Sequence, residues 1–187
     1  HRNGAPVTKE VFEQTFGFRG VQFGNYVEQS RRQSDLNEGY DALMDMAAVL
    51  GIPPRSLSLN GKLGLAFGAR GKGGKNAPGA HYEPDRVVIN LTKGGGPGAL
   101  AHEWWHSLDN YFGSTGRVPA YGTGAGPAAD TREQMKAAFT AVKAATQMAS
   151  LRQRSQRVDQ RKPSTARKPY WNTPIELSAR SFESYIV

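Results

Sequence analysis

The chain has 187 residues, a formal charge of +8 and no cysteine. That length suits a single domain with its own core, and the lack of cysteine excludes disulfides and thiolate metal sites. No stretch approaches the roughly 20 apolar residues of a membrane span. The start at His1 shows neither an initiator Met nor the apolar run of a signal peptide. We therefore expect a cytoplasmic domain taken from a longer protein, with no membrane contact and an oligomeric state that stays open.

The first half of the chain begins with two predicted helices. Residues 8–16 predict a short helix capped by Thr8, and the aromatic and glycine-rich segment 16–26 predicts irregular or extended chain. A second helix is predicted over residues 35–50, with Ser34 as its N-cap and Gly51 as a left-handed C-cap. Its apolar stripe consists of Leu36, Tyr40, Leu43, Ala47 and Leu50.

Short strands follow and predict a small twisted sheet. Residues 57–59 and 62–67 flank Asn60-Gly61, a pair that favours a tight hairpin turn. Two further strands, 80–83 and 86–91, are joined by Pro84-Asp85, and the β-branched run Val87–Ile89 suits an interior strand. Residues 68–79 are rich in glycine and basic residues, but they lack the Gly-Lys-Ser/Thr of a phosphate loop, so we expect a flexible loop.

The second half is predicted to be helical. Residues 99–112 are apolar nearly all round, which indicates a buried helix. A long helix is expected from Thr131 into the 150s, with Thr131 and Gln134 as its capping box. The last helix begins near Thr173-Pro174. The expected single domain 1–187 thus comprises a helix and sheet portion (1–98), the central helix (99–112), a long helix with a basic linker (130–168) and a C-terminal helix (173–187).

The central helix contains a metal-binding pattern, His102-Glu103-Trp104-Trp105-His106. Histidines four residues apart lie on one face of a helix, roughly 6 Å apart along its axis, so both imidazoles can reach one zinc ion. Glu103 is rotated about 100° from His102, beside the metal position, where a carboxylate can act as general base. The pattern predicts one Zn²⁺ ion, held by His102 and His106.

A third ligand must come from elsewhere, because catalytic zinc usually has three protein ligands and a water. The metzincin extension is excluded, since this chain has Asp109 and Phe112 where that class has Gly and His. Glu176 and Glu183 lie seven residues apart on one face of the last helix. Glu176 is favoured because the small Ala179 lets the helix approach closely, and Glu183 is the alternative ligand.

Further residues are candidates for supporting roles. Glu183 is a candidate acceptor for a ligand imidazole if Glu176 is the ligand. Asp109 is either such an acceptor or an ion-pair partner of Arg180. The tetrahedral intermediate of peptide hydrolysis needs a donor to its oxyanion, and the candidates are His81, Tyr111, Tyr170 and Arg180. The alternative for His81 is an ordinary surface position on a strand, and the alternative for Tyr170 is ordinary packing.

These segments resemble a known family. The motifs that carry the resemblance are Phe16–Asn25, Leu63–Gly71, Ala80–Pro84, His102–Phe112 and Glu176–Glu183, and the resemblance extends over most of the chain outside the basic segment. They resemble the zincin-like metallopeptidases of large polyvalent proteins, which phages and conjugative elements carry. The resemblance implies an α+β zincin-like fold, a gluzincin-like site with HExxH and a distant Glu, and a protein substrate. It is also compatible with delivery into a host or recipient cell alongside DNA.

Taken together, the sequence predicts a zinc metallopeptidase that cleaves a protein or peptide substrate, with Glu103 as base. The rival is a non-catalytic, basic, DNA-associated module that keeps a structural or vestigial metal. A latent zymogen that needs other parts of a longer chain is a third reading. Residues 152–168 hold seven basic residues and one acid. We expect a solvated linker there, with a weak nucleic-acid contact as the alternative.

Overall fold

The computed structural model describes residues 1–24, 29–70, 79–92, 96–113, 120–161 and 170–187. Within these residues it contains both helices and a four-stranded sheet, so the expected α+β class is confirmed at that level. The chain groups into two compact units, one of residues 1–107 with 186–187 and one of residues 108–185. Of the predicted loop over residues 68–79, residues 71–78 lie outside the described residues.

Two helices open the first unit. Helix α1 (Lys9–Phe16) begins as predicted at Thr8, whose Oγ1 accepts a hydrogen bond from Val11 N, and ends at the left-handed Gly17. Helix α2 (Gln29–Leu50) begins before the predicted start. Ser34 lies inside it and donates to Glu38 Oε1, so the expected N-cap is wrong. The predicted end is confirmed, because Gly51 adopts a φ of 64°.

The segment after α2 departs from the hairpin prediction. Residues expected as a strand form a 3-10 helix, η1 (Pro54–Ser58), which buries Leu57. Asn60 and Gly61 do turn the chain with positive φ, but Leu59 shares that conformation and the turn leads from η1 into β2 (Gly64–Phe67). Pro53-Pro54 explains this outcome, since proline suits the first turn of a helix and cannot donate to a sheet.

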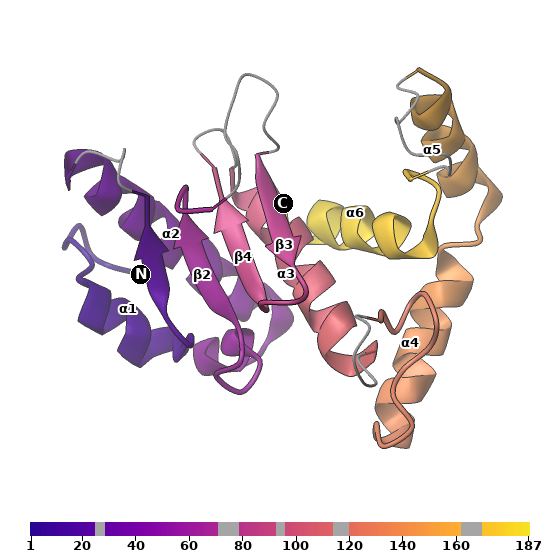
Figure 1. Ribbon diagram of the computed structural model, residues 1–187, viewed down its shortest axis with the longest axis horizontal. Coiled ribbons are helices and arrows are strands. Elements are labelled where there is room, and N and C mark those ends of the chain that lie inside the picture. Colours follow the sequence, from indigo (N-terminus) through magenta and orange to yellow (C-terminus); the bar gives the residue numbers. More distant parts are fainter. Residues whose placement is uncertain (25–28, 71–78, 93–95, 114–119, 162–169) are drawn as a thin grey trace. The chain divides into compact units, whose positions relative to one another are not determined.

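The sheet has the strand order β1-β2-β4-β3 (Figure 1). Strand β1 (Val21–Phe23) and strand β4 (Val88–Leu91) flank β2 in parallel, and β3 (Ala80–Glu83) pairs antiparallel with β4 at the edge. The predicted connection of the last two strands through Pro84-Asp85 is confirmed. Val87 has a φ of 51° and belongs to that turn rather than to the strand interior.

The strand register separates an apolar face from a polar one. Phe23, Phe67 and Leu91 share a row on one face, next to the row of Val21, Leu65 and Ile89. Helix α2 packs on this face, because a Cβ added at Gly39 would lie 3.1 Å from the Phe67 ring; in Figure 1, α2 lies behind β1 and β2. The opposite face has two rows: Gln22, Ala66, Asn90 and His81, then Gly64, Val88 and Glu83.

Helix α3 (Pro97–Gly113) follows the sheet, with Pro97 in its first turn as predicted. Trp104 is 3% exposed and its indole Nε1 donates to the carbonyl oxygen of Leu57 at 2.8 Å. This bond fixes α3 on η1, so Trp104 is a core residue, as the apolar pattern of the helix indicates.

The second unit is helical. The expected long helix is two helices, α4 (Glu133–Ala145) and α5 (Ala149–Arg161), separated at Thr146–Met148. The expected capping box is wrong, because Arg132 occupies the N-cap and makes no capping bond with its side chain. Helix α6 (Pro174–Ile186) begins where the sequence predicts it. Among the described residues no helix has the length and apolar character needed to cross a membrane.

Candidate metal centre

The two histidines of α3 point toward one another. Their Nε2 atoms lie 3.1 Å apart, and the ring centroids are 4.8 Å apart with the planes at 76°. His106 is 8% exposed and His102 is half-buried. Two nitrogens bound to one tetrahedral zinc ion at about 2.0–2.1 Å lie about 3.3 Å apart. The observed separation is compatible with a shared metal ion, and without an ion it is the length of a hydrogen bond between the two rings.

Local bonds hold this turn of α3 in place. Ser107 is fully buried and its hydroxyl donates to the carbonyl oxygen of Trp104 at 2.7 Å. This contact lies within α3 itself, and the bond from Trp104 to η1 is the one that fixes the rotation of the helix about its axis. That rotation sets the direction of both imidazoles. Glu103, the candidate base, is half-buried on the same turn.

In α6, Glu176 lies in the first turn and is 2% exposed. Its backbone N–H donates to Thr173 Oγ1 at 3.3 Å, so Thr173 caps the helix at the residue where the sequence predicts its start. An acidic side chain in a first turn is stabilised by the helix dipole. The fold thus keeps a carboxylate buried at this position. Glu183, two turns later on the same helix, is half-buried.

Arg180 connects the Glu176 carboxylate to the rest of the second unit. Its Nε lies 3.5 Å from Glu176 Oε1, and its Nη2 donates to Ser155 Oγ on α5 and to the carbonyl oxygen of Trp171. The guanidinium carbon lies 5.0 Å from the centre of the Trp171 ring, a cation–π distance. Trp171 N in turn donates to Asp159 Oδ1 at 2.9 Å. One arginine therefore joins α5, the segment before α6 and the buried carboxylate.

His102, His106 and Glu176 form a group of side chains that could hold a metal ion. These are the three ligands that the sequence favours, and Glu183 is not in the group. Two imidazole nitrogens and a carboxylate oxygen are a donor set that suits zinc.

Asp109 lies two turns after His102 on α3 and is fully buried. Its Oδ1 accepts from Thr123 N at 2.8 Å, and its Oδ2 accepts from the Thr123 hydroxyl. Asp109 therefore anchors the segment after α3. The sequence predicted a partner for this carboxylate but missed Thr123, whose only signal is that it is a polar residue within a Gly/Pro/Ala segment.

The candidate oxyanion donors occupy separate places. His81 is on the edge strand β3, where its Nε2 lies 3.3 Å from Glu83 Oε1. Tyr170 is 50% exposed and its ring packs edge-on against Trp171. Tyr111 is half-buried on α3, with its ring 5.0 Å from that of Phe112.

The sequence missed Ser155 and Trp171 as partners of Arg180, because that contact joins segments distant in the chain.

No protein-family model, no curated protein and no solved structure matches this chain.

Proposed function

We propose that the chain is a zinc-dependent endopeptidase domain with a zincin-like fold, in which His102, His106 and Glu176 hold one zinc ion. The observation that carries the proposal is the convergence of the His102 and His106 Nε2 atoms to 3.1 Å on a helix that also bears Glu103. A structural histidine pair would not need a carboxylate one residue after its first member. The His-Glu pattern provides both metal ligands and a base.

A bound zinc ion would supply Lewis acidity and lower the pKa of a water at the site to about 7. The protein supplies the proton transfers. The Glu103 carboxylate accepts the proton of the attacking water and then donates it to the amine that leaves the cleaved peptide bond. Arg180 and Thr173 hold Glu176 in place, through the guanidinium contact and the helix cap. Glu176 would supply a carboxylate oxygen as the third ligand beside the two imidazole nitrogens.

The test combines metal content with cleavage. We expect the purified chain to carry one zinc ion, to cleave fluorescein-labelled casein, to lose activity with a chelator and to regain it with zinc. Glu103→Gln keeps the metal and loses about 10²–10⁴-fold in rate, the usual contribution of a general base. Glu133→Gln, an exposed acid of α4, is the matched control and cleaves normally.

Cleavage at the wild-type rate by Glu103→Gln would contradict the assigned base. A chain that holds zinc but cleaves no protein, folded or unfolded, would favour the non-catalytic, DNA-associated alternative. The exposed arginines Arg154 and Arg157 of α5 are the feature that favours this alternative. Its signature would be DNA binding that weakens steeply with salt and depends on those two residues.

A further inference from the structure

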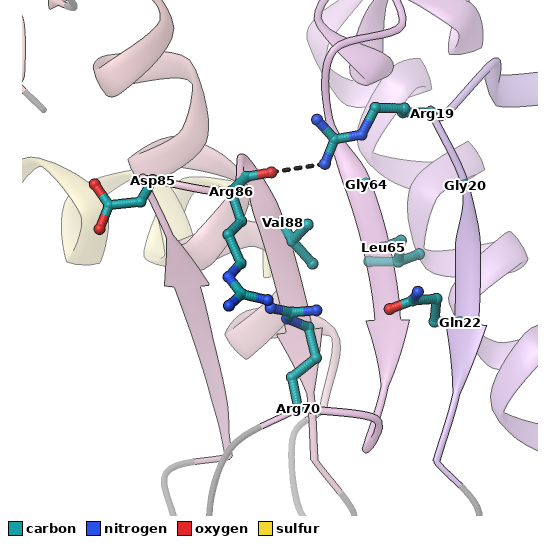
Figure 2. Close-up of a pocket in the computed structure, with 9 residues that line it drawn as sticks. All are labelled: Arg19, Gly20, Gln22, Gly64, Leu65, Arg70, Asp85, Arg86 and Val88. Atoms are coloured by element: carbon teal, nitrogen blue, oxygen red, sulfur yellow. Dashed lines mark hydrogen bonds between the residues drawn. The ribbon is translucent and has the colours of Figure 1, made fainter. Parts of the chain in front are cut away.

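The polar face of the sheet carries a hollow that the proposed peptidase site does not use. It has a volume of about 560 Å³ and lies over β1, β2 and β4 (Figure 2). We call it the arginine hollow, after the three arginines among its lining residues. The lining includes Arg19, Gln22, Gly64, Arg70, Arg86 and Val88. All of these residues belong to the first unit.

Gly64 keeps the floor of the arginine hollow open. A Cβ added at this position would lie 3.2 Å from Val88 Cγ2 and 3.6 Å from Arg19 Nη2. A larger side chain would fill the space between the arginine and the strand. The guanidinium of Arg19 therefore lies over bare backbone, where a small group can approach it.

The positive charges around the arginine hollow outnumber the negative ones. Arg70 makes two bonds of 2.7 Å to Glu83, and these bonds hold the pKa of the Glu83 carboxyl below its usual value of 4.5. Arg86 Nε lies 3.8 Å from Glu83 Oε2, the oxygen that also accepts from Arg70 Nη2. The side chain of Arg86 is 67% exposed. The single carboxylate of Glu83 thus lies beside two guanidinium groups. Glu83 Oε1 also lies 3.3 Å from His81 Nε2.

Arg19 adds a third positive charge. Its Nη2 donates to the backbone carbonyl oxygen of Arg86 at 2.6 Å (Figure 2). Because this acceptor is neutral, the positive charge of Arg19 is not compensated by the contact. Asp85 is the acid among the lining residues, and its carboxylate points away from the arginines in Figure 2. The hollow therefore has a net positive charge at neutral pH, on guanidinium groups from three separate chain segments.

We propose that the arginine hollow binds a phosphate group, supplied by a nucleic-acid backbone or by a free phosphate ester. Guanidinium forks match phosphate oxygens in pairs. Donors that approach from three segments suit a tetrahedral anion with several acceptor oxygens better than a planar carboxylate. The overall charge of +8 attracts such a ligand at long range. This site is independent of the proposed peptidase chemistry.

The test measures binding of a fluorescein-labelled single-stranded oligonucleotide by anisotropy, with inorganic phosphate and polyglutamate as competitors. Arg86→Gln removes the guanidinium and keeps the carbonyl that Arg19 contacts. We expect it to weaken oligonucleotide binding about 5–10-fold at low salt and to reduce the salt slope by about 1. Arg132→Gln, an exposed arginine before α4, removes the same charge elsewhere and is expected to bind nearly as wild type.

The competitors identify the source of the phosphate. If inorganic phosphate displaces the oligonucleotide at millimolar concentration or below, a free phosphate ester is the ligand. If it does not, the extended backbone is needed. The proposal is overturned if the wild-type protein binds neither the oligonucleotide nor inorganic phosphate, or if Arg86→Gln binds the oligonucleotide as tightly as wild type. It is also overturned if Arg132→Gln or Arg157→Gln weakens oligonucleotide binding as much as Arg86→Gln does. Tighter binding of polyglutamate than of the oligonucleotide would indicate an acidic peptide instead.

A second experiment uses only the wild-type protein, so its result does not depend on whether the arginine variants fold. The Nε–H resonances of Arg19 and Arg86 are followed by NMR while inorganic phosphate or the oligonucleotide is added. We expect these two signals to shift at lower ligand concentration than that of Arg132. Equal shifts for all three arginines would show nonspecific charge screening and would reject the site.

Discussion

His102 and His106 come from one turn of α3, whereas the position of Glu176 depends on α5, on the segment before α6 and on Arg180. The separation of the two imidazoles follows from helix geometry alone, because residues four apart share a face. The position of the carboxylate requires contacts across 25 residues of sequence, from Ser155 to Arg180. The relative position of His102 and His106 should therefore tolerate mutation elsewhere in the chain. The position of Glu176 should be the part of the site that mutation of its supporting contacts can disturb by degrees.

The largest effect is expected from breaking the local pair. His106→Ala removes one of the two nitrogens that lie 3.1 Å apart, so zinc affinity should fall by well over the roughly 100-fold typical of indirect partners, and casein cleavage should stop. Zinc content by elemental analysis and cleavage rate are the measurements. His81→Ala is the matched control and should keep its zinc. Loss of zinc from both variants in equal measure would mean that the α3 pair is not the metal site.

The next effect compares the two acids of α6. Glu176→Gln keeps the size of the side chain but removes the charge of a residue that is 2% exposed, and we expect about a 100-fold loss in zinc affinity. Glu183→Gln, on the same helix and half-buried, should leave affinity within about twofold, as is usual for positions away from such contacts. Competition with a chromophoric chelator measures both. The opposite ranking would make Glu183 the ligand.

The same distinction between local and distant contacts explains which predictions from sequence hold. The start of α1 at Thr8 and the left-handed Gly17 and Gly51 follow from one residue and its immediate neighbours. The pairing of β2 does not. Asn60-Gly61 favours a hairpin, yet the residues before it form η1, and β2 lies between β1 and β4 and pairs in parallel with both. A parallel arrangement requires contacts that no turn residue specifies.

The candidate site follows the same rule. The helix and the spacing of His102 and His106 could be predicted, since both depend on one short segment. Thr123 as the partner of Asp109, and Ser155 with Trp171 as partners of Arg180, could not be predicted, since each contact joins separate segments. The break of the expected long helix at Thr146 also escaped prediction, because no proline or glycine marks it.

A smaller effect is expected from loosening the distant ligand without removing it. Arg180→Ala deletes the contacts to Glu176, Ser155 and the Trp171 carbonyl, and should weaken zinc binding about 10–100-fold, as the loss of a partner that orients a ligand does. Arg180→Lys keeps the charge but not the fork, so it should rescue affinity only in part. The readout is zinc affinity beside the thermal midpoint of the metal-free chain.

A double variant separates positioning from stability. If Arg180 acts through Glu176, Arg180→Ala should cause little further loss of zinc affinity in the Glu176→Gln background. A fully additive loss would mean that Arg180 supports the fold of the second unit in general. In that case the thermal midpoint and the zinc affinity should fall together in the single variant.

The smallest expected effect concerns a carboxylate that an arginine holds near the surface rather than in the interior. The Arg70 bonds lower the pKa of Glu83, so its ionised form stabilises the folded state above a pH of about 4.5, and this stabilisation is lost as the pH falls through the lowered pKa. The Glu83 side chain is 24% exposed, so solvent screens the pair and the contribution should be about 1 kcal/mol or less. Urea unfolding of wild type and Glu83→Gln at pH 7 and pH 3 measures it. The two proteins should differ at pH 7 and this difference should become smaller at pH 3, and a gap that widens at pH 3 would contradict the lowered pKa.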